Sequence, residues 1–152
     1  MAGLFLNSDA YLRGTSQHSF SDNGSELFTN FICKIEGWKT RTKNLHWAAP
    51  VENGDSIHRR LDDLLDTLVE YEDAIAEGYM GILGKMNPDD INAMGCSCTK
   101  AADLVSIILT DTISFYDSLP TDTRYKGITS ETEVFIQDLN KYKYLFSLCN
   151  SI

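Results

Sequence analysis

Hydrophobic residues recur every three or four positions through much of the chain, which is the spacing of a helix with one buried face. Over residues 27–45 this spacing predicts a first helix. Over residues 57–82 a longer and more regular stripe predicts a second helix, which Gly84 and Pro88 then stop. Residues 1–22 contain Gly, Ser, Asn and Asp without sustained periodicity, so we expect them to form a loosely ordered N-terminal arm.

The second half of the chain shows two further helical patterns. Residues 98–119 predict a third helix, and the capping-box pair Ser130 and Glu133 predicts the start of a fourth. The connection over residues 87–97 is long enough to hold a short extra helix. Because the alternation typical of strands is absent from the sequence, the pattern predicts an all-α four-helix bundle over residues 23–152.

Composition places the chain among ordinary folded proteins. It has 152 residues, of which 43 % are hydrophobic and 23 % charged, the size and balance of one globular domain. The opening MAGLFLNSDA lacks the basic segment of a secretory signal, and no apolar run reaches the roughly 20 residues that cross a bilayer. The four cysteines are scattered rather than arranged as a disulfide framework. We therefore expect a cytoplasmic protein without a membrane partner.

The net charge is −9, which affects the kinds of partner that the chain is expected to bind. Nucleic-acid binding requires Lys and Arg side chains that displace counterions from phosphate, and the first 30 residues contain only Arg13. An acidic surface instead attracts cations, including divalent metal ions. The charge thus argues against DNA binding and favours a protein that handles metal.

Four potential metal ligands lie along the second predicted helix: His58, Asp62, Asp73 and Glu77. On a helix they project within an arc of about 100°, beside the apolar stripe rather than on it. They cannot share one ion within a single chain, because His58 and Asp73 are separated by about 22 Å along the helix axis.

Two copies of this helix, packed antiparallel, remove that difficulty. The pair His58 and Glu77 and the pair Asp62 and Asp73 are both centred between positions 67 and 68. A two-fold axis at that point places His58 opposite the partner's Glu77 and Asp62 opposite the partner's Asp73. His46 lies at the end of the first helix and can reach the same place. Each of two identical sites would then combine residues of both chains.

Two imidazoles with three carboxylates form a donor set that suits iron or zinc and is harder than a thiolate site. Other interpretations of this spacing stay open. Carboxylates four residues apart on a helix commonly form a solvated face, and a His–Asp pair at the same spacing is common as a surface hydrogen bond. A protein that sequesters manganese or zinc without turnover would use the same ligands.

Three segments of the chain resemble the Dps family of mini-ferritins. They are the run Thr42-Lys43-Asn44-Leu45-His46-Trp47, a histidine twelve residues after His46, and the segment Asp73-Ala-Ile-Ala-Glu77. All five ligand positions of the family pattern are matched without a gap: His46, His58, Asp62, Asp73 and Glu77. The sequence contains no Glu-x-x-His pair of the kind that builds the intra-bundle di-iron site of full ferritins.

The resemblance implies ferritin-like four-helix subunits that assemble into a hollow dodecamer, with a di-iron site shared between two subunits. By family, His46, Asp73 and Glu77 would hold the tighter iron, and His58 and Asp62 would support the second. Such proteins oxidise ferrous iron, preferably with hydrogen peroxide rather than dioxygen, and store ferric mineral. Both effects protect against oxidative damage. An alternative is a structural or DNA-associated shell that retains the ligands without using them.

Further residues carry two interpretations each. Trp47 would pack over the iron site by resemblance, or serve as an ordinary core aromatic at a helix end. Cys96-Ser-Cys98 is a C-x-C pair that could bind a soft metal or act as a redox couple. With no second pair or histidine nearby, two ordinary thiols are the simpler interpretation. Lys39 and Arg41 belong to a basic cluster that we expect to pair with the acidic excess.

Overall fold

The computed structural model describes the backbone of residues 3–50 and 54–149, and the side chains of residues 24–50 and 55–149. It contains four long helices and two short 3-10 helices: α1 (Gly3–Trp47), α2 (Gly54–Leu83), η1 (Pro88–Asp90), α3 (Ala101–Ser118), η2 (Thr123–Tyr125) and α4 (Lys126–Leu148). No strand occurs among the described residues. The predicted all-α four-helix bundle is confirmed, and η1 lies where the short extra helix was expected.

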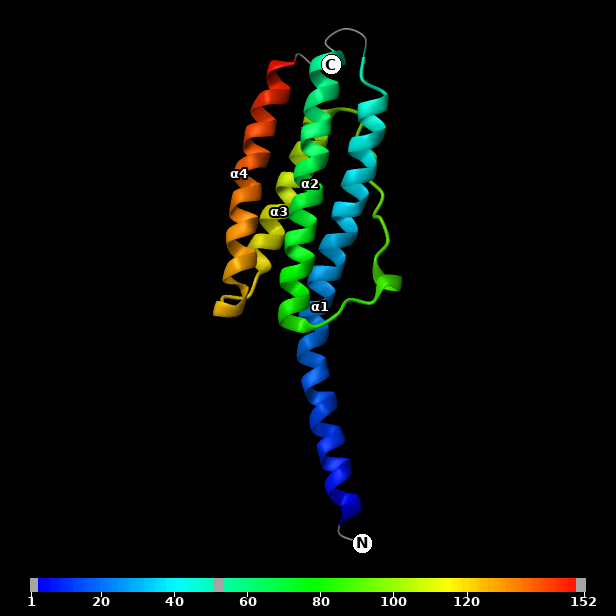
Figure 1. Cartoon of the computed structure of the whole chain (residues 1–152), viewed down its shortest axis with the longest axis vertical. Helices are drawn as coiled ribbons and strands as arrows, with labels where there is room; N and C mark the ends of the chain where they lie inside the picture. The colour runs from blue at the N-terminus through cyan, green and yellow to red at the C-terminus, as the bar shows by residue number, and fades with distance from the viewer. Residues whose placement is uncertain (1–2, 51–53, 150–152) are drawn as a thin grey trace.

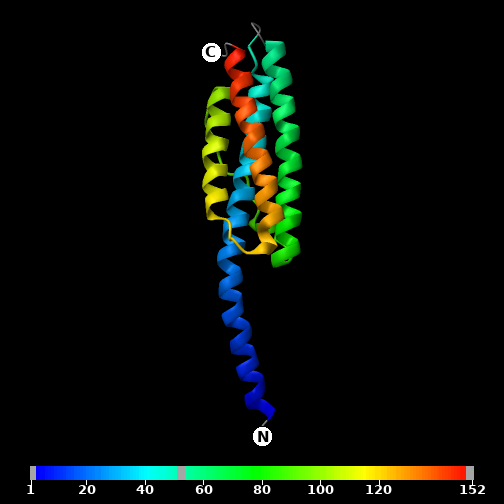
Figure 2. The ribbon, with the colours of Figure 1, turned by 90° about the vertical axis from the view of Figure 1, so that its left-hand side faces the viewer.

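The four helices form a bundle with one long crossover. Helices α1 and α4 each pack against both α2 and α3, so α1 and α4 lie on a diagonal (Figure 1). Helix α2 runs antiparallel to α1. The chain then returns along the outside of the bundle, so that α3 runs parallel to α2 and α4 runs back (Figure 2). A long connection between the second and third helices is one of the standard bundle topologies.

The core is built from the apolar stripes of all four helices. Its largest fully buried side chains are Phe28, Ile35, Leu61, Leu64, Leu68, Ile75, Leu104, Val105, Ile108, Phe135, Leu139 and Phe146. The rings of Phe31 and Phe115 stack at 3.8 Å and tie α1 to α3, while those of Tyr71 and Phe135 stack at 4.0 Å and tie α2 to α4. Within the described residues, none of the helices is both long and apolar enough to cross a membrane.

The N-terminal segment differs from the expectation. Its backbone continues α1 from Gly3 as part of a 45-residue helix, so the prediction of a loosely ordered arm is wrong for residues 3–22. In both views this part of α1 projects beyond the other helices (Figures 1 and 2). Once the bundle holds the C-terminal half of α1 in helical form, each further turn extends an existing helix, and extension is far less costly than nucleation.

The start of α4 also differs from the expectation. Helix α4 begins at Lys126, so Ser130 and Glu133 lie inside it and the predicted capping box is wrong. The side chain of Asp122 accepts a hydrogen bond from the backbone N–H of Arg124 at 2.9 Å, which caps η2. The chain passes from η2 directly into α4, and therefore the helix needs no later cap.

The connection between α2 and α3 is attached to α1. Gly84 ends α2 with a φ of +92°, a conformation that glycine adopts without strain. Further along, the backbone N–H of Met94 donates to the carbonyl of Cys33 at 2.9 Å. This contact is so close that a Cβ on Gly37 would lie 1.7 Å from the carbonyl oxygen of Met94. Gly37 therefore allows the connection to lie directly on α1.

Candidate metal centre

His46 and His58 meet because α1 ends and α2 begins at the same end of the bundle. His46 lies in the last turn of α1, and His58 lies near the start of α2. Their ring centroids are 3.5 Å apart with an angle of 32° between the ring planes. The His46 side chain is mostly buried, with 14 % of its surface exposed, while His58 is open to solvent.

The backbone determines which ring nitrogens are free. His46 Nδ1 lies 3.2 Å from the carbonyl oxygen of His58, and His58 Nδ1 lies 3.1 Å from the carbonyl oxygen of His46. A carbonyl oxygen only accepts hydrogen bonds, so each imidazole carries its proton on Nδ1. An imidazole with its proton on Nδ1 binds a metal ion through Nε2. The two hydrogen bonds also fix the orientation of the rings, as second-shell contacts do at metal centres.

Asp62 completes a group of three potential ligands. Its Oδ1 atom lies 3.0 Å from His46 Nδ1, and 55 % of its side chain is exposed. Each of His46, His58 and Asp62 offers a ligand atom within 4.8 Å of the others, the one such group of three found in the described part of the chain. Nitrogen and oxygen donors in this mixture fit ferrous iron or zinc.

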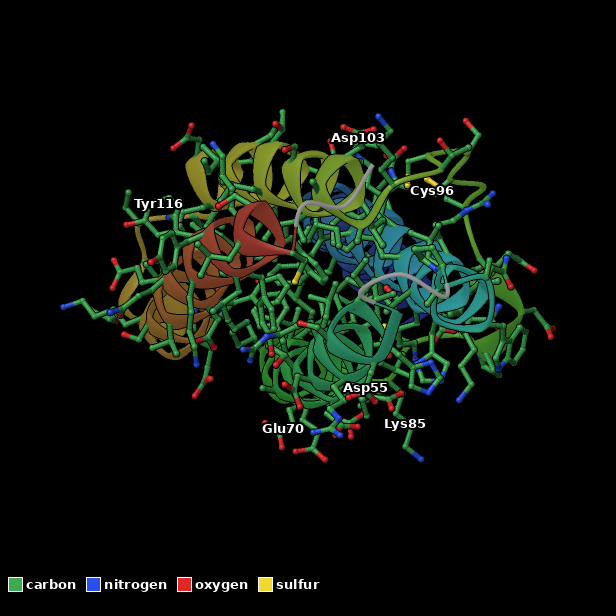
Figure 3. The ribbon with its side chains drawn as sticks, turned by 90° about the horizontal axis from the view of Figure 1, so that it is seen from above. Asp55, Glu70, Lys85, Cys96, Asp103 and Tyr116 are labelled. Carbon is green, nitrogen blue, oxygen red and sulfur yellow. The ribbon has the colours of Figure 1, made fainter. Side chains whose placement is uncertain are left out.

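The structure does not bring the other two predicted ligands to this group within one chain. Asp73 and Glu77 lie on the same helix as Asp62, about 16 and 22 Å further along its axis. Both side chains are exposed, so a second chain can approach them. Other acidic side chains of α2, including Asp55 and Glu70, also point away from the bundle (Figure 3). The pairing of Asp73 and Glu77 with a partner's histidines stays a prediction.

Trp47 is not a core residue. In the isolated chain 70 % of it is exposed, so the interpretation of Trp47 as an ordinary core aromatic is wrong. Helix α1 ends at this residue, and none of the other helices covers it. A large exposed aromatic beside a candidate metal ligand is a natural contact for another chain. Its packing over an iron site stays a prediction.

A partly buried cluster of charges lies between α1 and α2 and was not predicted from the sequence. Lys39 Nζ donates to Glu36 Oε1 at 2.8 Å and also to Glu72 Oε2, which confirms the expected role of Lys39 as an ion-pair partner. Only 7 % of Glu72 is exposed, and its Oε1 atom has no hydrogen-bond partner among the described residues. A signal was present in the sequence, because Glu72 interrupts the apolar stripe between Leu68 and Ile75.

Burial controls the charge state of this cluster. Burial raises the pKa of Glu72 to about 7, and the hydrogen bond from Lys39 only partly opposes that rise. Burial also acts to raise the pKa of Glu36, but there the hydrogen bonds with Lys39 and Glu72 and the positive charge of Lys39 prevail, and the pKa is lowered. The pKa of Lys39 is raised, because its two acidic partners outweigh the effect of its burial. The result is an ion pair with a second, easily protonated carboxyl group.

Comparison of the chain with protein-family models, with curated proteins and with solved structures found no match. Its function is therefore inferred from the residues of the site.

Proposed function

We propose that this chain is a ferroxidase of the Dps type, which oxidises ferrous iron at a site shared between two subunits and retains ferric mineral in a hollow homo-oligomer. One observation carries the proposal: the rings of His46 and His58 lie 3.5 Å apart, and His46, His58 and Asp62 each offer a ligand atom within 4.8 Å of the others. A surface hydrogen bond between a histidine and an aspartate would not require a second imidazole against the first.

The proposed substrate is ferrous iron, with hydrogen peroxide or dioxygen as the oxidant. Two ferrous ions each lose one electron to one molecule of hydrogen peroxide, which takes up two protons and leaves as two molecules of water. Imidazole nitrogens and carboxylate oxygens are suitable ligands for both iron oxidation states. The net charge of −9 raises the local concentration of ferrous ions at the surface. Consuming both reactants limits hydroxyl-radical formation.

The missing ligands are proposed to come from a second subunit. Three ligands lie together in one chain, while Asp73 and Glu77 stand exposed and too far away on α2. A two-fold axis beside the middle of α2 would bring the partner's Asp73 and the partner's Glu77 to the histidines. By the Dps resemblance, such dimers would assemble into a dodecamer in the cytoplasm. The alternative in which manganese or zinc is sequestered without turnover uses the same donors.

Anaerobic loading of the metal-free protein with ferrous iron, followed by stoichiometric hydrogen peroxide, tests the proposal. We expect a rapid ferric absorbance in the wild type and none in a variant with His46→Ala, Asp73→Ala and Glu77→Ala. Asp103→Asn is a matched control, because Asp103 is an exposed acid of α3, outside the proposed α2 interface. Equal oxidation by the wild type and the triple variant would refute the proposal. Tight zinc binding by the wild type without iron oxidation would favour sequestration.

A further inference from the structure

A pair of thiols lies in contact on the connection between α2 and α3. The Sγ atoms of Cys96 and Cys98 are 3.7 Å apart, and both residues are half-buried. Two thiolates on a tetrahedral zinc ion, each about 2.3 Å from the metal, lie about 3.8 Å from one another. The two sulfurs therefore already have the separation of ligands that share an ion. A disulfide would require about 2.05 Å between them.

The neighbouring structure holds these sulfurs in place. Arg41 of α1 donates a hydrogen bond from Nε to the carbonyl oxygen of Cys96, and the Met94 N–H is bonded to Cys33 of the same helix. Helix α3 begins at Ala101, shortly after Cys98. The thiol segment is therefore attached to α1 on one side and to α3 on the other. Cys96 lies at the edge of the molecule, outside the four-helix core (Figure 3).

Met94 is a further sulfur-containing side chain on the same connection. Met94 precedes Cys96 by two residues, as Cys96 precedes Cys98, and Met94 and Cys96 line one surface groove against α1. Met94 is 41 % exposed. In the described part of the chain, neither cysteine belongs to a group of three His, Cys, Asp or Glu ligands. Two thiols and a thioether form a soft donor set.

The soft donor set and the number of ligands select the metal. Structural zinc takes four protein ligands, and this segment offers at most three. Thiolate and thioether donors suit copper(I), which is soft and monovalent. The guanidinium of Arg41 is close enough to interact electrostatically with Cys98. Its positive charge offsets the negative charge of a thiolate pair. We propose that Cys96 and Cys98, supported by Met94, form a copper(I) site that is separate from the histidine site of α1 and α2.

Binding is an exchange of protons for metal without any change of oxidation state. Two S–H bonds break and two Cu–S bonds form, so that two protons are released for each copper(I) ion.

Competition between the full-length, fully reduced protein and a chromophoric copper(I) chelator, without oxygen, tests the proposal. We expect the wild type to withdraw one copper ion per chain and to develop an ultraviolet thiolate-to-copper absorption. A variant with Cys96→Ser and Cys98→Ser should withdraw none. Met94→Leu, which preserves the shape of the side chain, should bind the same amount more weakly. Cys149→Ser is the matched control, because Cys149 lies at the end of α4, and it should behave as the wild type.

Two further arms make the outcome decisive. The variant with His46→Ala, Asp73→Ala and Glu77→Ala should still bind copper(I), so failure of the ferroxidase proposal would not affect this one. Circular dichroism checks that each variant keeps its helices. If the double serine variant does not fold, the single serine variants replace it. Copper binding as tight as that of the wild type in folded serine variants overturns the proposal. So does a reduced wild type that takes up no copper but forms a Cys96–Cys98 disulfide with peroxide.

Discussion

His46 and His58 hold one another in position. The Nδ1 atom of each ring donates to the backbone carbonyl of the other residue, at 3.2 Å and 3.1 Å. The two bonds join the end of α1 to the start of α2 and fix the orientation of both rings. The pair is therefore both a structural link between two helices and the centre of the candidate metal site.

Removing either ring should affect metal binding more than folding. We expect His46→Ala to weaken the binding of zinc, used as a redox-inert probe, by more than the roughly 10- to 100-fold typical of a lost second-shell contact. Isothermal titration calorimetry on the metal-free protein measures the affinity, with Asp103→Asn as the control. Zinc affinity equal to that of the wild type would show that the ring is not a ligand.

A mixture of two inactive variants tests the shared site. Asp73→Ala and His58→Ala each damage both sites of a homodimer. In a mixed dimer, one site combines the intact histidines of the first variant with the intact acids of the second, and the other site carries both defects. We therefore expect re-assembled mixtures to regain iron oxidation at one of every two sites of each mixed interface.

The control for this experiment is each variant re-assembled alone, which should stay inactive. Assembly of the mixture is checked by size-exclusion chromatography with two distinguishable tags. A mixed interface that forms but oxidises no iron would contradict the two-fold pairing of α2.

The raised pKa of Glu72 predicts a pH-dependent stability. The ordinary pKa of this carboxyl is 4.5, and in the folded protein it is about 7. The folded state therefore holds a proton that the unfolded state has lost between these values. The associated stabilisation is complete below about pH 4.5 and is lost as the pH rises through 7.

Glu72→Gln should remove this dependence, because glutamine does not titrate. We expect the free energy of unfolding of the metal-free wild type to fall by roughly 1 to 3 kcal/mol more than that of the variant between pH 5 and pH 8. Glu36 and Lys39, which contact Glu72, are present in both proteins. Urea denaturation at several pH values measures the difference, and parallel pH curves would contradict the prediction.

A matched pair of glycine substitutions tests how the connection lies on α1. A Cβ on Gly37 would meet the Met94 carbonyl, so Gly37→Ala should lower the free energy of unfolding by about 1 to 3 kcal/mol. A Cβ on Gly81 would meet nothing within 4 Å, and alanine is the better helix former. Gly81→Ala should therefore stabilise the protein, by roughly 0.5 to 1 kcal/mol. Thermal denaturation compares the two, and equal midpoints would contradict the close contact.

The candidate site was only partly predictable from the sequence. Spacing identifies His58, Asp62, Asp73 and Glu77 as one face of a helix, because the helical period is a local property. It also shows that this face cannot close a site within one chain. The spacing could not predict the hydrogen bonds between His46 and His58, because these bonds depend on how the end of α1 lies against the start of α2.

The sequence by itself determined the four helices and the end of α1, because the buried face of a helix repeats every 3.6 residues. It also determined where α2 ends, because a glycine with a positive φ ends a helix. Only the tertiary structure decided which charged and polar atoms of distant segments meet. The burial of Glu72 against Lys39 and the hydrogen bond from Arg41 to the carbonyl of Cys96 both depend on the packing of one segment against another. The physical reason is the sequence separation of the interacting residues. A helix is held by hydrogen bonds between residues four apart, whereas these contacts join distant segments through packing.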